Sequence, residues 1–223
     1  MKKFLPDLIA ILAFIILSFA YFFPADIEGR ILFQHDTAAG VGAGQESKEY
    51  LERTGERTRW TNSIFGGMPT YQMSPSYDST TSLKGVEKVY RLFLPDYVVL
   101  TFIMMLGFYI LLRAFGISAW LAGLGGVIWA FSSYFFILIP AGHIWKFVTL
   151  AYIPPTIAGV VLAYRKKYLL GGIITALFIA LQIQSNHIQM SYYFMFVILF
   201  FVGAYFEDAY KKKELDRKST RLN

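Results

Sequence analysis

The residues best suited to chemistry are three histidines, an aspartate and a lysine that lie outside or at the edges of the apolar stretches. His35 stands beside Asp36 in the first half of the chain. His143 precedes Lys146 by three residues, and His187 lies in another short polar segment. A carboxylate can take a proton from a hydroxyl group, and a lysine can face a phosphate. If these residues take no part in a reaction, Asp36 would instead form an Asx turn or helix cap, and Lys146 would anchor its helix at the membrane surface.

The three histidines do not form a recognisable metal site in the sequence. No two of them are three or four residues apart, the spacing that places two ligands on one face of a helix. The chain has no cysteine, so a thiolate metal site, a cysteine nucleophile and a disulfide are excluded. We therefore predict no resident cofactor, and a divalent metal ion stays an open alternative.

A second group of residues combines aromatic rings with amide groups. Trp60, Asn62 and Tyr71 fall within one short polar segment. Such a mixture suits a sugar, because its C–H faces stack on rings while its hydroxyls need hydrogen-bond partners. An aromatic anchor at the membrane interface would use the same residues. We predict that these three residues bind substrate, together with Lys146, His143 and His187.

The composition indicates an integral membrane protein. Of the 223 residues, 56% are hydrophobic and 16% charged, whereas soluble domains carry roughly a quarter charged residues. The net charge of +6 invites comparison with nucleic-acid-binding proteins. However, the basic residues form short clusters beside apolar runs and no extended patch, so we expect the lipid bilayer as a partner and no nucleic acid.

Six apolar runs are each about long enough to cross a bilayer, which takes about 20 residues in a helix. They predict an all-α polytopic helix bundle with one long first loop, residues 24–94, which holds more than half of the fifteen acidic residues. The predicted spans are 4–23, 96–112, 117–139, 147–164, 168–184 and 190–206. Two consecutive prolines, Pro154 and Pro155, predict a kink in the fourth span.

The distribution of lysine and arginine predicts the orientation. If every run spans, nearly all basic residues of the short flanks fall on one side, which the positive-inside rule makes cytoplasmic. These residues are Lys2, Lys3, Arg113, 165–167 and 211–213. Both termini are then cytoplasmic and the long loop lies outside. The first run also has features of a signal peptide, with a small-x-small site at residues 18–20, and cleavage there would leave the loop on the same side.

The long loop contains two segments with helical patterns. Residues 46–53 offer ion pairs at i,i+4 spacing, which predicts a short helix. Leu83, Val86, Tyr90 and Phe93 recur at helical spacing, with charged residues between them. This pattern predicts an amphipathic helix that lies on the bilayer surface before Pro95 opens the second span.

The last eight residues, 216–223, match one reading frame of a common sequencing adapter, codon by codon. We therefore exclude them from the predicted fold and take residues 1–215 as the native part of the chain.

Several motifs together resemble a known family. They are Gln34-His35-Asp36, Thr54-Gly55-Glu56, the run from Trp60 to Tyr71, Gly142-His143 with Lys146, and the run from Asn186 to Met190. Residues 1–215 resemble the start of the YfhO-type bacterial membrane proteins, and look most like members from Bacteroidetes. Members of that family are longer and have further spans, so the resemblance implies an N-terminal fragment.

The family is similar to GT-C glycosyltransferases. These are polytopic enzymes that take a sugar from a polyprenyl-phosphate lipid on the outer face of the membrane, here the bacterial inner membrane. The resemblance implies a GT-C-like fold, transfer to an envelope glycan or lipid, and an acidic catalytic residue in the first outer loop. Asp36, with its neighbour His35, fits that position, although it stands as His-Asp and not as a paired Asp-x-Asp. Two alternatives are a transporter or flippase of lipid-linked saccharides and a non-catalytic assembly subunit.

Overall fold

The computed structural model describes residues 4–30, 32–70 and 81–211. This part of the chain forms nine helices and one two-stranded antiparallel sheet in which Trp60 pairs with Pro69. The elements are α1 (Leu5–Phe22), α2 (His35–Thr54), β1 (Trp60–Thr61), β2 (Met68–Pro69), α3 (Thr81–Tyr90), α4 (Asp96–Ala114), α5 (Ala119–Ala130), α6 (Ser133–Ala141), α7 (Ile144–Tyr164), α8 (Tyr168–Gln184) and α9 (Ile188–Lys211). Tyr71 and the segment 216–223 lie outside the described residues.

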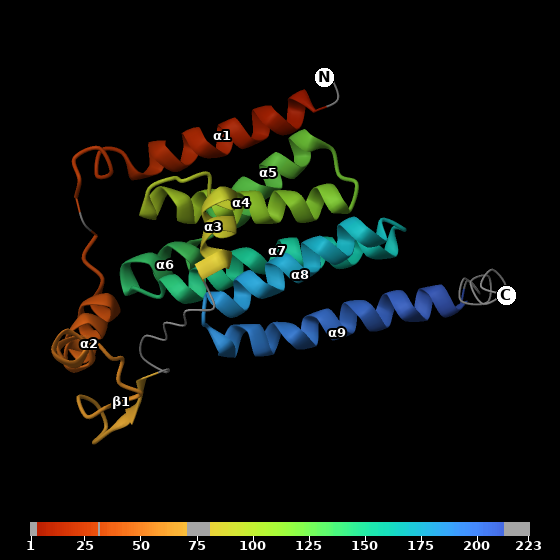
Figure 1. The fold of residues 1–223 in the computed structure, drawn as a ribbon. Helices are drawn as coiled ribbons and strands as arrows, with labels where there is room; N and C mark the ends of the chain where they lie inside the picture. Colours follow the sequence, from red (N-terminus) through yellow and green to blue (C-terminus); the bar gives the residue numbers. More distant parts are fainter. Residues whose placement is uncertain (1–3, 31, 71–80, 212–223) are drawn as a thin grey trace.

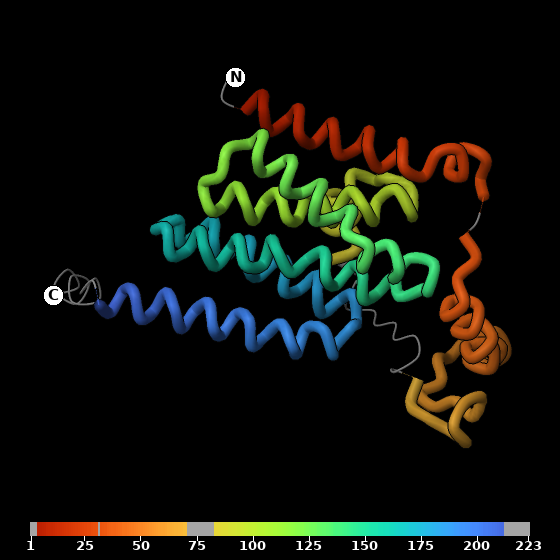
Figure 2. The backbone as a smooth tube through the Cα atoms, turned by 180° about the vertical axis from the view of Figure 1, so that it is seen from behind, coloured from red at the N-terminus to blue at the C-terminus, as the bar shows by residue number. Residues whose placement is uncertain are grey.

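The long helices run side by side and form a bundle. In Figure 1, α1 lies along one edge and α9 along the other, with α4, α5, α7 and α8 between them. Helix α2 and the β1–β2 hairpin lie beyond one end of the bundle, and the start of α1 and the end of α9 lie toward the opposite end, as the reverse view in Figure 2 also shows. The long loop therefore occupies one end of an all-helical bundle, and the predicted fold class is confirmed at this level.

Four helices are long and apolar enough to cross a membrane: α1, α4, α7 and α9. The bent pair α5–α6 makes a fifth candidate span, and α8 is apolar but has only 17 residues. By length and composition the chain is thus a multi-pass membrane protein with four to five spans among its described residues. The prediction of six spans is confirmed in part. Helix α8 coincides with the predicted run 168–184, but it is too short to count as a candidate span.

The predicted third span, 117–139, is not one helix. It breaks after Ala130, and α5 and α6 meet at an angle of 46°. Ser132 has extended backbone angles, and serine is a weak helix former because its side chain competes for backbone groups. The aromatic ring of Tyr21 from α1 packs 5.5 Å from Phe131 and 4.5 Å from Phe136, on either side of the break. The bend therefore depends on packing with α1, which the continuous apolar run conceals.

Helix α7 runs through both prolines without interruption. Pro155 has no N–H, so the carbonyl of Ala151 loses its partner within the helix. Gly107 of α4 lies against this carbonyl: a Cβ atom there would come within 2.5 Å of the Ala151 oxygen. A glycine at the contact allows α4 and α7 to approach closely, as small residues do in membrane bundles.

A polar cluster joins α1 and α4 at the end of the bundle where the termini lie. Asp7 accepts a hydrogen bond from Tyr109 and forms an ion pair with Arg113, whose Nε lies 2.8 Å from the carboxylate. Arg113 also donates to the Ile117 carbonyl at 2.7 Å, just beyond the end of α4. The sequence patterns did not single out Asp7, because its partners are about a hundred residues away.

The helices of the first loop differ from their predicted forms. Helix α2 extends over His35–Thr54 and includes the glycine-rich stretch that precedes the predicted helix 46–53. Helix α3 is present at the predicted position, but two of its predicted outward-facing charged residues do not face solvent. Glu87 and Arg91 turn toward the bundle, with side chains 15% and 26% exposed, while Val89 is 61% exposed. Ion pairing between the two charged residues makes their burial tolerable.

Candidate functional site

The first turn of α2 is attached to the end of α6, at the end of the bundle beyond which α2 lies. Gln34 donates a hydrogen bond to the Ile139 carbonyl at 2.6 Å and accepts one from the Thr37 hydroxyl at 2.9 Å. Gly142 follows α6 with a φ of 87°, and a Cβ atom there would meet the Thr37 backbone nitrogen at 3.0 Å. This close approach requires glycine and fixes the start of α2 beside the residues that follow α6.

Asp36 and His143 meet at this junction, although 107 positions separate them in the sequence. The Nε2 atom of His143 lies 3.3 Å from a carboxylate oxygen of Asp36. The side chains remain 49% and 58% exposed, respectively, so both can be reached from solvent. The structure thus brings together two of the residues predicted from sequence, each from a different predicted segment.

Lys146 and His187 lie near the same junction. The Lys146 ammonium group stands over the ring of Tyr134, 5.5 Å from its centroid. Burial lowers the pKa of His187, a hydrogen bond with its own backbone opposes this shift, and electrostatic interactions with Lys146 and His143 lower the pKa further. A lowered pKa favours the neutral imidazole, which can accept a proton. Lys146, His143 and His187 thus interact electrostatically, and His143 also contacts Asp36.

His35 and the aromatic group do not join this cluster. The His35 ring packs edge-on against Phe33, with the ring centroids 5.1 Å apart. Trp60 and Asn62 belong to the β1–β2 hairpin, which attaches to α2 near Glu46. Glu46 is ten residues beyond Asp36, about 15 Å along a helix. The structure therefore separates the predicted site residues into an Asp36 cluster and a hairpin group.

Glu46 holds the hairpin to α2. Its carboxylate accepts hydrogen bonds from the Thr61 hydroxyl at 2.5 Å and from the backbone N–H groups of Asn62 and Ser63 at 2.7 and 3.1 Å. These donors, led by the Thr61 hydroxyl, lower the pKa of Glu46. The Asn62 side chain is itself engaged, because it donates to Glu46 and accepts from the Trp60 indole. Trp60 keeps an exposed ring face.

A second polar cluster was missed by sequence analysis. Glu87 of α3 accepts hydrogen bonds from Arg91 at 2.5 Å, from the Tyr152 hydroxyl at 2.7 Å and from the Gln184 amide at 2.8 Å. The available signal was the i,i+4 spacing of Glu87 and Arg91 on the amphipathic helix. We name Glu87, Arg91, Tyr152 and Gln184 the α3 cluster.

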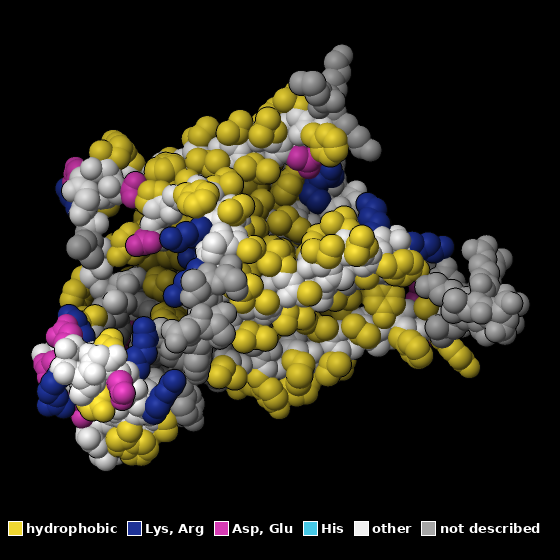
Figure 3. Space-filling view, viewed as in Figure 1, with side chains coloured by type: hydrophobic (Ala, Val, Ile, Leu, Met, Phe, Trp, Pro, Cys, Tyr) yellow, Lys and Arg dark blue, Asp and Glu magenta, His cyan; other side chains and the backbone are white. Residues whose placement is uncertain are grey.

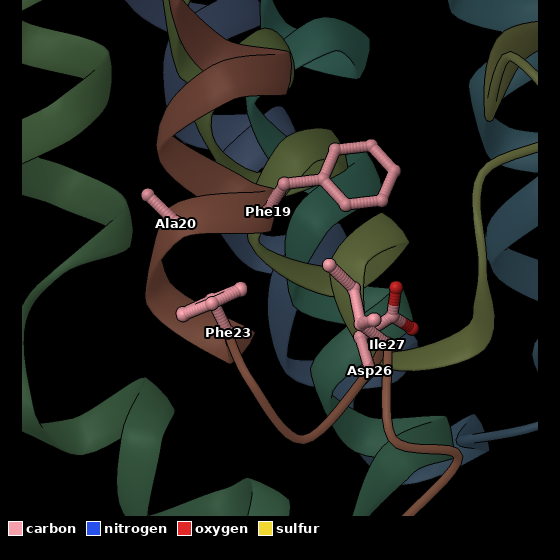
Figure 4. A pocket seen from close by; sticks show the side chains of 5 residues that line it. All are labelled: Phe19, Ala20, Phe23, Asp26 and Ile27. Atoms are coloured by element: carbon pink, nitrogen blue, oxygen red, sulfur yellow. The ribbon is translucent and has the colours of Figure 1, made fainter.

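A small cavity of about 150 Å³ lies at the outer end of α1. Figure 4 shows the side chains that line it, which are apolar except for one carboxylate: Phe19, Ala20, Phe23, Asp26 and Ile27. None of the predicted site residues lines this cavity. It offers an apolar surface and does not bring reactive groups together.

Charged side chains gather at the two ends of the molecule. In Figure 3 both signs occur around the first loop, whereas the opposite end is mainly basic and the surface between is hydrophobic. Among the described residues, no three histidine, aspartate or glutamate side chains form a group able to hold a metal ion. Asp36 and His143 are two neighbouring side chains of the kinds that can bind a metal ion.

Fold and site together define a multi-pass membrane protein with an exposed carboxylate–histidine pair at one end of its bundle. No family model matches the chain, and neither a curated protein nor a solved structure matches it.

Proposed function

We propose that the protein is a membrane glycosyltransferase that moves a sugar from a polyprenyl-phosphate-linked donor to an outer acceptor, a glycan or lipid of the cell envelope. The proposal is supported by one observation above the others: the contact between Asp36 of the first loop and His143 at the start of α7. An exposed carboxylate, a histidine and a nearby lysine meet where the bundle ends. The resemblance to YfhO-type proteins supports the same assignment.

In the proposed reaction, Asp36 takes the proton from an acceptor hydroxyl as its oxygen attacks the anomeric carbon of the sugar. The bond between that carbon and the phosphate oxygen breaks, and polyprenyl phosphate leaves with the electron pair. Lys146 stabilises the charge that develops on the phosphate. His143, at 3.3 Å, receives the proton from Asp36 and passes it to solvent.

Two other carboxylates of the first loop are less suited to this task. Glu46 accepts four hydrogen bonds from the hairpin, and Glu87 accepts three within the α3 cluster. A carboxylate that is already saturated with donors binds an incoming hydroxyl poorly. Asp36 is more than half exposed and contacts one histidine, so a base role favours it.

The distribution of ionisable residues favours a transferase over a transporter or flippase. A transport pathway places charged groups near the middle of the membrane. In the described spans such residues lie in the first or last turns, as Asp7, Arg113, Lys146 and Lys211 do. A non-catalytic assembly subunit would tolerate the loss of Asp36, and the transfer assay below separates that alternative.

We further propose that the protein lies in the bacterial inner membrane, with both termini cytoplasmic and the first loop outside. The chain has no cysteine, so single cysteines report the topology cleanly. An impermeant thiol reagent should label Arg57→Cys in intact cells, and Lys167→Cys only after the membrane is opened. The reverse pattern would contradict this orientation.

The assay for the proposed activity is sugar transfer from a polyprenyl-phosphate donor in membranes that contain the protein. Asp36→Asn is compared with Glu49→Gln, an exposed carboxylate on the same helix. Loss of transfer with the first variant only, at equal protein level, supports a base role for Asp36. Full transfer with Asp36→Asn would remove Asp36 from the chemistry and favour the non-catalytic alternative.

A further inference from the structure

Helix α3 docks on the bundle through a single carboxylate. Glu87 accepts hydrogen bonds from Tyr152 of α7 and from Gln184 of α8, at 2.7 and 2.8 Å. Arg91 supports the same contact, since its Nε and Nη2 atoms lie 3.3 and 3.2 Å from the Tyr152 hydroxyl. These polar contacts with the bundle all converge on Glu87 and its partner Arg91, so removing one carboxylate would weaken them together.

The apolar contacts of α3 are limited. The Tyr90 ring packs against Phe178 and Tyr152, with centroids 5.0 and 6.0 Å apart. Val89 is 61% exposed, and Phe93 just beyond the helix is 74% exposed. The Tyr90 ring and the hydrogen bonds of Glu87 and Arg91 therefore hold the helix against α7 and α8.

The docked position also carries a cost. Leu92 and Phe93 directly follow α3 with φ angles of 50° and 56°, a left-handed conformation that is unfavourable for bulky residues. The Tyr90 hydroxyl and the Gln184 carbonyl oxygen are buried without a hydrogen-bond partner among the described residues. Burial raises the pKa of Tyr90, which keeps the phenol protonated and in need of an acceptor. Strain and unpartnered groups thus oppose the contacts of Glu87.

We infer that α3 is a hinged lid, held closed by Glu87 and able to open by rotation about Leu92 and Phe93. Opening relaxes the two left-handed residues and exposes the unpartnered groups to water. It also uncovers Tyr152 and Gln184. Thr149 lies about one turn from Tyr152 on α7, toward Lys146. Ser185 directly follows Gln184 at the end of α8, toward His187. The Thr149 and Ser185 hydroxyls hydrogen bond to each other. Opening of the lid therefore changes the exposure of these polar side chains of α7 and α8, on the side that leads toward Lys146 and His187, and the inference does not depend on which reaction the Asp36 cluster performs.

Spin labels can measure the lid position in the whole chain. Val89 on α3 and Leu169 at the far end of α8 are both exposed, so each can be replaced by a cysteine that carries a spin label. The chain has no native cysteine that would also be labelled. Leu169 is fifteen residues from Gln184, about 22 Å along the helix, so the pair falls in a range suited to electron–electron double resonance. In lipid nanodiscs the native sequence should give one main distance. Glu87→Gln should raise the ratio of open to closed molecules about tenfold, because hydrogen bonds to a charged group are lost.

Three further variants make the result decisive. Tyr152→Phe removes a hydrogen bond from the α7 side and should shift the distances in the same direction by a smaller amount. Leu92→Gly, added to Glu87→Gln, removes strain from the closed form and should restore part of the closed population. Glu52→Gln on α2 is the control, since it removes an exposed i,i+4 pair and should change nothing. Native distances in both Glu87→Gln and Tyr152→Phe, with the protein folded, would overturn the lid.

Discussion

Two carboxylates of the same loop, Asp36 and Glu87, have opposite surroundings. Asp36 is 58% exposed and contacts one histidine at 3.3 Å. Glu87 is 15% exposed and accepts hydrogen bonds from three side chains: Arg91 just after α3, Tyr152 of α7 and Gln184 of α8. A carboxylate that is enclosed by donors stabilises a particular packing, whereas one that keeps open lone pairs can receive a ligand. The comparison therefore assigns chemistry to Asp36 and docking of α3 to Glu87.

The largest expected effect concerns the activity proposed for Asp36. Asp36→Asn should lower sugar transfer by about 10²–10⁴-fold, the usual contribution of a general base. The free energy of unfolding should stay within about 0.5 kcal/mol of the native value, because the side chain is exposed. Transfer and denaturant unfolding are measured on the same purified protein. A fall in stability that matches the fall in activity would make Asp36 a structural residue.

Glu87→Ala should show the converse behaviour. Removing one member of a buried ion pair leaves Arg91 without its partner, which costs about 3 kcal/mol of unfolding free energy. The midpoint of unfolding in detergent, followed by tryptophan fluorescence, measures this loss. Glu52→Ala, in an exposed ion pair, is the matched control and should change the free energy by less than about 1 kcal/mol. Equal midpoints for the two variants would remove the contrast between buried and exposed pairs.

A smaller effect is expected at Lys146. Lys146→Met removes the charge and keeps an apolar stem, so the KM for the phosphate-linked donor should rise about tenfold while the protein stays folded. Lys88→Met, at an exposed position on α3, is the control and should leave the KM unchanged. An unchanged KM in Lys146→Met would mean that this lysine only anchors the helix.

The smallest predicted effect is a pH dependence of stability from His187. Its pKa is lowered in the folded protein, mainly by burial, so the unfolded chain binds the proton first. Stability should therefore fall as the pH drops below about 6.5, the ordinary histidine value, toward the lower pKa of the folded state. Unfolding midpoints between pH 8 and pH 5 should fall more steeply for the native protein than for His187→Gln. Parallel curves would show that burial of His187 does not affect stability.

The sequence by itself determined the membrane class and most helix positions, because long apolar runs and their charged flanks are local features. The helices α1, α4, α7 and α8 begin and end within three residues of the predicted runs. It also indicated Asp36, His143, Lys146 and His187, since polar residues stand out next to apolar spans. Their grouping at one end follows once the spans alternate in direction.

The tertiary structure decided what depends on contacts between distant segments. The break after Ala130 is accompanied by packing of Tyr21 against α5 and α6, and an apolar run contains no trace of such a partner. The inward turn of Glu87 depends on hydrogen bonds from α7 and α8, which no helical pattern on α3 can reveal. The same holds for Asn62, whose amide is engaged by Glu46. Local periodicity fixes which residues share a helix face, and only the neighbouring helices determine which face is buried.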